Sequence, residues 1–127
     1  MHKALVLTVS LIFLAACAPF IPVTKIADLP PEKQSALKAI KVYEPSERSG
    51  GSYDVIGDLT GNSCKNLMWE PSPSRDDAID QMRHLASERG ANGITDIKCE
   101  QPRGTSFATN CWESLTCTAK AIKVKGR

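Results

Sequence analysis

The sequence predicts a small α+β domain, in which a four-stranded sheet with the element order strand, strand, helix, strand, strand is covered by one helix and tied by two disulfides. Four segments alternate apolar and polar residues as strands do, and one segment between them has helical periodicity. Four cysteines, an even number, lie within or beside these segments. We assign the domain to residues 39–127.

Two strands are expected before the helix. Residues 39–43 alternate in polarity, and the following segment, 46–52, has two glycines and three serines and is expected to be a loop. The second strand covers residues 53–63, with a bulge or a point of close approach at Gly57. Gly61-Asn62 is expected to turn the chain just before Cys64.

The helix has a clear beginning and end. Ser74 followed by Asp77 is a variant of the capping box, and negative charge at Asp76 and Asp77 suits a helix amino terminus. Gly90 is a good left-handed terminator. One apolar stripe runs between these ends and contains Ala78, Ile79, Met82, Leu85 and Ala86.

Two further strands are expected at residues 94–100 and 114–124, with a polar loop at 104–110. In the last strand, Leu115, Cys117 and Ala119 share one face, whereas Ile122 and Val124 have the opposite parity. Either a bulge near Lys120 returns them to the core side, or both faces of the sheet are partly buried there.

Residues 1–16 have the pattern of a signal peptide, with a short basic start, an apolar stretch and small residues before Cys17. A retained membrane helix is the alternative, but it needs about 20 apolar residues, and Pro19 and Pro22 interrupt the stretch. Leu14-Ala15-Ala16-Cys17 resembles a bacterial lipobox, which implies cleavage before Cys17 and acylation of its sulfur and new amino group. An ordinary secreted protein with a chance cysteine is the other alternative.

Residues 17–38 are expected to be the lipidated cysteine and a flexible tether. Four prolines, Pro19, Pro22, Pro30 and Pro31, oppose regular hydrogen bonding. Within this segment residues 31–38 either stay extended or form a helical turn or two, with Pro31 at the first helical position. A tether of about 20 residues reaches at most about 70 Å when fully extended.

Charge argues against a nucleic-acid partner. Loss of residues 1–16 removes Lys3 from the 16 Lys and Arg residues, so 15 basic and 14 acidic residues remain and the net charge is +1. Binding to a phosphate backbone depends on clustered Lys and Arg. The domain is also small enough to need additional stabilisation. If Cys17 carries lipid, Cys64, Cys99, Cys111 and Cys117 make two bridges in one of three connectivities.

No enzyme motif is found: the chain has no CxxC, GxSxG, HExxH or glycine-rich phosphate loop. We therefore expect no enzyme, no metal and no cofactor. His84 is interpreted as a partly exposed surface residue rather than a zinc ligand, and Asp76, Asp77 and Asp80 as helix-start residues rather than a carboxylate site. Trp112 is a candidate to pack over a bridge, and Trp69, among prolines, to lie on the surface as a partner contact.

The cysteine pattern resembles the soluble domain of the RcsF family, outer-membrane lipoproteins that sense envelope damage for the Rcs phosphorelay. The match covers residues 39–124 and the lipobox. Four stretches carry it: Gly61-Asn-Ser-Cys64, Ala91-Asn92-Gly-Ile, Lys98-Cys99-Glu100 and Cys111-Trp-Glu-Ser-Leu-Thr-Cys117. The resemblance implies the interleaved disulfides Cys64–Cys111 and Cys99–Cys117.

The resemblance also implies a function without catalysis. A lipid on Cys17 would hold the chain in the outer membrane, with the domain facing the periplasm and in part the cell surface; Ala rather than Asp at residue 18 implies export onward from the inner membrane. Implied partners are outer-membrane barrel proteins with the barrel assembly machinery, and an inner-membrane repressor of the phosphorelay.

One departure from the family is the tether, since family tethers are longer and richer in proline and basic residues. This puts in doubt threading through a barrel and contact with the inner membrane. The alternative function is a structural or accessory envelope lipoprotein without signalling, and a third is a domain that binds a small ligand or metal.

Overall fold

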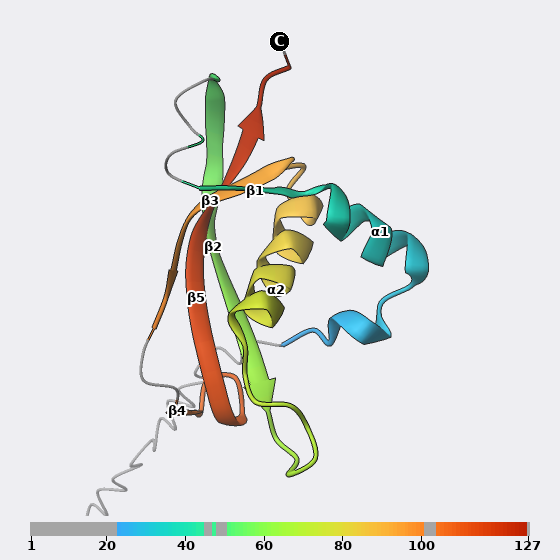
Figure 1. Ribbon diagram of the computed structural model, residues 1–127, viewed down its shortest axis with the longest axis vertical. Helices are drawn as coiled ribbons and strands as arrows, with labels where there is room; N and C mark the ends of the chain where they lie inside the picture. The colour runs from blue at the N-terminus through green and yellow to red at the C-terminus, as the bar shows by residue number, and fades with distance from the viewer. Residues whose placement is uncertain (1–22, 45–46, 48–50, 101–103, 127) are drawn as a thin grey trace, which may run out of the picture.

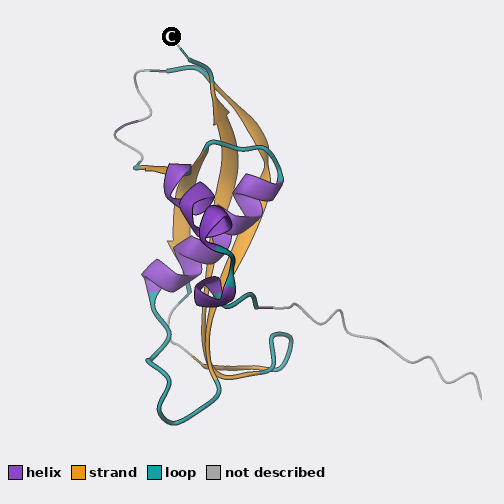
Figure 2. Ribbon diagram, turned by 90° about the vertical axis from the view of Figure 1, so that its right-hand side faces the viewer, coloured by secondary structure: helices purple, strands orange, loops and turns teal. Residues whose placement is uncertain are grey.

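The computed structural model of the chain describes residues 23–44, 47, 51–100 and 104–126. The leader, Cys17 and the first part of the tether lie outside these residues. In the described part, both helices lie on one face of a mixed sheet (Figure 1). Figure 2 looks onto the helix-covered face of the sheet, with the helices in front of the strands. The fold is therefore α+β, as the sequence predicts.

The described part of the sheet has five strands rather than the four expected. The strands are β1 (Lys41–Tyr43), β2 (Tyr53–Lys65), β3 (Gly93–Cys99), β4 (Gly104–Ser106) and β5 (Cys111–Val124). In the order β1-β3-β5-β2, β1 pairs with β3 in parallel and the other pairs are antiparallel, while the short β4 pairs with β5. β4 falls in the segment expected to be a polar loop.

The expected turn at Gly61-Asn62 is wrong. Both residues are inside β2, opposite Cys117 and Thr116 of β5. Gly61 serves close approach instead, because a Cβ atom built there would lie 2.1 Å from the backbone oxygen of Ala78. The glycine lets the helix rest on the strand. Of the bulge or close approach expected at Gly57, the bulge is found, since the β2–β5 register shifts between Val55 and Gly57.

The long helix, α2 (Arg75–Glu88), has the ends that the sequence predicts. The Ser74 hydroxyl accepts a hydrogen bond of 3.2 Å from the Asp77 N–H. Gly90 has a φ of 71°, and the Ala91 N–H donates to the Ala86 carbonyl at 3.0 Å, which closes the last turn as in a Schellman motif.

The core lies between α2 and the sheet. α2 contributes Ala78, Ile79, Met82 and Ala86 to it, and Leu85 packs at its edge. These residues are the stripe expected from the sequence. The sheet supplies the facing residues of three strands: Leu59, Ile94, Leu115, Cys117, Ala119 and Ala121.

The far end of β5 is buried on both faces. Ala121 belongs to the core under α2, whereas its neighbour Ile122, 1% exposed, lies on the other face. There Ile122 and the Tyr43 ring both lie close to the Cα of Gly93. Of the two explanations for the parity of Ile122, burial of both faces is therefore correct, and the register shifts fall in β2 and β3 instead.

Part of the expected tether belongs to the fold. Residues Pro31–Ala39 form α1, with Pro31 in its first turn, and α1 packs beside α2 with Leu37 buried. A 3₁₀ turn, Ile26–Asp28, precedes it. Thr24 also contacts α2, because its carbonyl accepts a hydrogen bond from the buried Gln81 side chain. The chain is thus held against the domain from Thr24 onward.

Candidate functional site

Two disulfides tie the sheet together, Cys64–Cys111 and Cys99–Cys117. The first joins the end of β2 to the start of β5, with its Cα atoms 5.5 Å apart. The second links Cys99 of β3 to its direct register partner on β5, with Cα atoms 4.0 Å apart. These are the interleaved pairs that the resemblance implies, and β5 carries one half of each.

The sulfur atoms of β5 are shielded from solvent. Cys117 is in the core and Cys111 is 2% exposed. Thiol–disulfide exchange needs access for an attacking thiolate. The β5 half of each bridge is protected from such attack, whereas Cys64 and Cys99 are half-buried. The disulfides hold the site in place.

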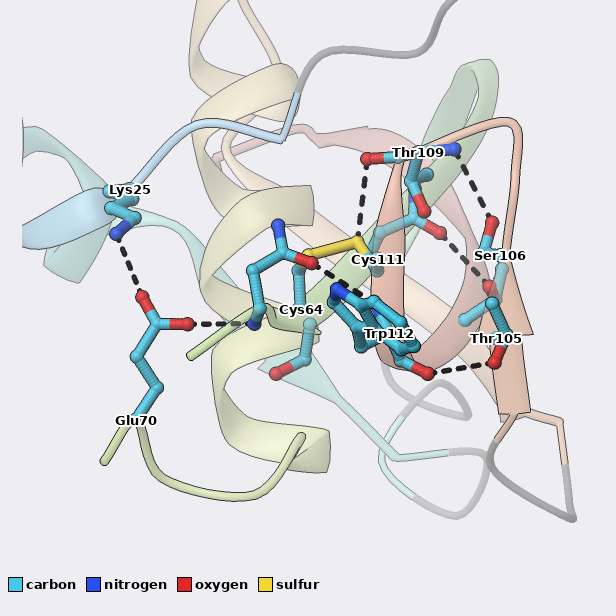
Figure 3. The surroundings of a disulfide bond; sticks show 12 residues. Lys25, Cys64, Glu70, Thr105, Ser106, Thr109, Cys111 and Trp112 are labelled. Carbon is cyan, nitrogen blue, oxygen red and sulfur yellow. Dashed lines mark hydrogen bonds and ion pairs between the residues drawn. A yellow bond between two sulfur atoms is a disulfide. The ribbon is translucent and has the colours of Figure 1, made fainter. Parts of the chain in front are cut away.

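Around Cys64–Cys111 a network of hydrogen bonds is centred on Glu70 (Figure 3). One carboxylate oxygen accepts from Lys25 Nζ at 3.0 Å. The other accepts from the backbone N–H groups of Asn66, at 2.7 Å, and Leu67, at 3.0 Å. Glu70 therefore closes the loop after β2 and fastens the amino-terminal segment to it.

This network should respond to acid. The hydrogen bond from the Asn66 N–H, with those from Lys25 and the Leu67 N–H, lowers the pKa of the Glu70 carboxyl to about 2. Because the folded-state pKa is depressed, the stabilisation is fully present above the ordinary carboxyl pKa of about 4.3 and is lost as pH falls toward 2. We expect an NMR titration of the Glu70 carboxyl to show this low midpoint.

The same titration of a Glu70→Gln variant is the control. In the wild type the Asn66 amide signal should move below pH 4, because its hydrogen-bond acceptor Glu70 becomes protonated. In the variant the same signal should not move in this range. A wild-type midpoint in the ordinary range would contradict the bonded carboxylate.

A second set of contacts joins this loop to β4 and β5. The backbone N–H of Trp112 donates to Asn66 Oδ1 at 3.0 Å, and the Thr105 hydroxyl donates to the Trp112 backbone carbonyl at 2.9 Å. With the disulfide, these bonds make one connected structure of the loop at residues 66–70, the β4–β5 turn at residues 107–110 and the first residues of β5 (Figure 3).

Large apolar side chains project from this connected end into solvent. Four of them are 75% to 93% exposed: Met68, Trp69, Phe107 and Trp112. We call these four residues the aromatic end. Trp69 lies on the surface, as expected. Trp112 directly follows the buried Cys111 of the bridge and is itself 75% exposed.

Met68 and Phe107 were not identified from the sequence. Each is a large apolar residue inside a turn, without a periodic partner in a helix or strand. That combination is the signal that could have indicated an exposed contact residue.

Other candidate residues do not converge on a site. His84 is largely shielded, with Nε2 3.5 Å from Glu88 Oε1, and Asp80 is paired with Arg83 at 2.8 Å. Asp76 and Asp77 occupy the first turn of α2. Within the described ranges, no three His, Cys, Asp or Glu side chains are placed to hold a metal ion. None of the helices described is long and apolar enough to cross a membrane.

No protein-family model matches the chain. Two curated proteins do match, both named Outer membrane lipoprotein RcsF, one from Escherichia coli strain K12 and one from Escherichia coli O6:H1 strain CFT073. Each is 26% identical over 136 aligned positions, which cover 98% of this chain and 99% of the relative. Along nearly its whole length, therefore, this chain is similar to the RcsF lipoproteins, the family that its cysteine pattern resembles.

Proposed function

We propose that this chain is an outer-membrane lipoprotein that reports envelope damage to the Rcs phosphorelay through protein–protein contacts. One observation carries the proposal: the similarity to proteins named Outer membrane lipoprotein RcsF extends over 98% of the chain, so it spans the leader as well as the domain. A shared domain alone would support a shared fold. Similarity that includes the leader also supports a shared place in the cell.

The anchor in this proposal is Cys17. Acyl chains on its sulfur and amino group would each add about 0.8 kcal/mol per buried methylene, and two or more chains hold a protein stably where one is marginal. Ala18 in place of an aspartate directs the lipoprotein to the outer membrane. The domain then faces the periplasm.

Signalling in this proposal is by binding. The disulfides and the Glu70 network make the domain a rigid body, which lowers the entropy lost when it docks on a partner. The partners proposed by resemblance are barrel proteins with their assembly machinery and the inner-membrane repressor of the phosphorelay.

Deletion of the gene tests the proposal. In the native host we expect an Rcs-dependent reporter to lose its induction after outer-membrane damage, because the sensor is gone, and a plasmid copy to restore it. A reporter for a different envelope-stress pathway, measured in the same cells, should stay inducible. Unchanged or increased Rcs induction in the deletion strain would favour the structural or accessory lipoprotein instead.

A further inference from the structure

We propose that the aromatic end docks on the lipid surface of the membrane in which Cys17 is anchored. The inference rests on the proposed lipidation of Cys17 and adds a second point of membrane contact. The domain would then lie with Met68, Trp69, Phe107 and Trp112 in the interfacial region of the bilayer.

The first argument is the exposure of these side chains. Single apolar residues on a surface are ordinary, but clusters of large ones indicate an interaction site. Here the four residues come from two loops and the start of a strand, which the Cys64–Cys111 disulfide and the Asn66–Trp112 hydrogen bond hold together. A shallow hollow of about 420 Å³ is lined by Phe107 and Trp112.

The second argument is the short length of chain between the anchor and the domain. Residues 31–38 are helical, and Thr24 already contacts α2, so the reach of about 70 Å expected from the sequence does not apply. Seven Cα–Cα steps separate Cys17 from Thr24, which amounts to at most about 25 Å. The anchored domain is therefore confined close to the bilayer.

The third argument is where this short segment enters the fold. Lys25 is bonded to Glu70 at 3.0 Å, and Glu70 is the neighbour of Trp69. The segment thus joins the domain at the loop that carries half of the aromatic end. In Figure 1 the loop after β2 and the β4–β5 turn lie at the lower end of the sheet, opposite the carboxyl terminus.

The dimensions of the sheet favour this end over the other. β2 has 13 residues, so it is about 43 Å long, which exceeds the reach of the tether. The exposed Val55 and Ile56 lie near the start of β2, at the opposite end from Cys64. Docking of the aromatic end leaves these two residues facing the periplasm.

Lipid is the occupant that the chemistry favours. Tryptophan is enriched at membrane interfaces because it combines an apolar ring with one N–H donor, and phenylalanine and methionine bury well among acyl chains. Two ion pairs lie beside the aromatic end, Lys25 with Glu70 at 3.0 Å and Lys65 with Glu113 at 3.7 Å. In each pair the positive charge is partly balanced when this end approaches the bilayer.

The chain has two tryptophans, and both belong to the aromatic end, so they are natural reporters. The full lipidated protein is placed in vesicles of phosphatidylethanolamine and phosphatidylglycerol whose acyl chains carry bromine close to the headgroups. We expect tryptophan emission to shift to the blue and to be quenched, and more strongly than with bromine near the chain ends.

Matched variants test which end makes contact. Met68→Ser combined with Phe107→Ser keeps both reporters and should reduce the quenching. Val55→Ser combined with Ile56→Ser removes a similar apolar area at the opposite end and should leave it unchanged. Equal quenching in wild type and in the Met68/Phe107 variant would overturn the proposal.

Anchoring and docking are distinguished by separate measurements. Mass spectrometry of the mature amino terminus and flotation with the vesicles test the anchor, and an unmodified terminus would overturn both the proposed function and this inference. A protein that floats but is not quenched keeps its anchor and overturns docking alone. An emission change that appears only after outer-membrane proteins are added would assign the aromatic end to a protein partner instead.

Discussion

Reduction of both disulfides is expected to unfold the domain or to leave it only marginally folded. In the chain-entropy model, the Cys64–Cys111 bridge, with a sequence separation of 47, contributes about 4 kcal/mol. The Cys99–Cys117 bridge, with a separation of 18, contributes about 3 kcal/mol. Small domains have total stabilities of about 5–15 kcal/mol. Urea unfolding followed by circular dichroism, with and without reductant, measures the effect.

Single-pair variants separate the two bridges. Cys64→Ala/Cys111→Ala removes the longer loop, whereas Cys99→Ala/Cys117→Ala removes the shorter loop and also sulfur from the core, where Cys117 is fully buried. We expect each variant to lose about 3–4 kcal/mol. Thiol counting under unfolding conditions verifies that reduction is complete. Superimposable urea curves before and after complete reduction would show that the bridges do not stabilise the domain.

Gly61→Ala is expected to be the most damaging single methyl addition in the sheet. The new Cβ would lie 2.1 Å from the carbonyl oxygen of Ala78 and 2.7 Å from Met82 Cγ. The first of these is a backbone atom, so α2 itself must move away from β2. Overpacking of this kind costs typically about 1–3 kcal/mol, and a shift of a whole helix places this variant at the upper end. Thermal or urea unfolding of the oxidised protein measures the loss.

Gly57→Ala is the matched control in the same strand. Its added Cβ would meet only Arg89 Nη1, at 3.6 Å, the far end of a flexible side chain. We expect a change within about 0.5 kcal/mol, as for a surface substitution. If Gly57→Ala and Gly61→Ala were equally destabilising, the loss would come from the strand backbone rather than from the contact with α2.

The elements that the sequence predicts well are those whose signals are local. The α2 boundaries depend on Ser74 and Gly90, which act on backbone groups within one turn. The stripe from Ala78 to Ala86 follows from helical periodicity alone. The same local reasoning failed at Gly61-Asn62, because a glycine that allows close packing and a glycine that allows a turn look alike in a sequence.

The candidate site was less predictable, because contacts between distant residues form it. Lys25 and Glu70 are 45 residues apart, and Asn66 and Trp112 are 46 apart. No periodicity in the sequence relates such residues. The segment expected to be a flexible tether because of its prolines is therefore found held against α2 from Thr24 onward. β5 begins at Cys111, three residues earlier than expected, so Trp112 belongs to the strand and not to the segment before it.

By itself the sequence determined the leader pattern, the even set of four cysteines behind Cys17, and the ends of α2. These depend on composition and on contacts within a few residues. Only the tertiary structure decided that β5 joins both disulfides, that residues 24–39 belong to the domain, and that four large apolar side chains are exposed at one end of the sheet. The reason is physical: strand register and burial are set by packing between residues far apart in the chain, which local pattern does not specify.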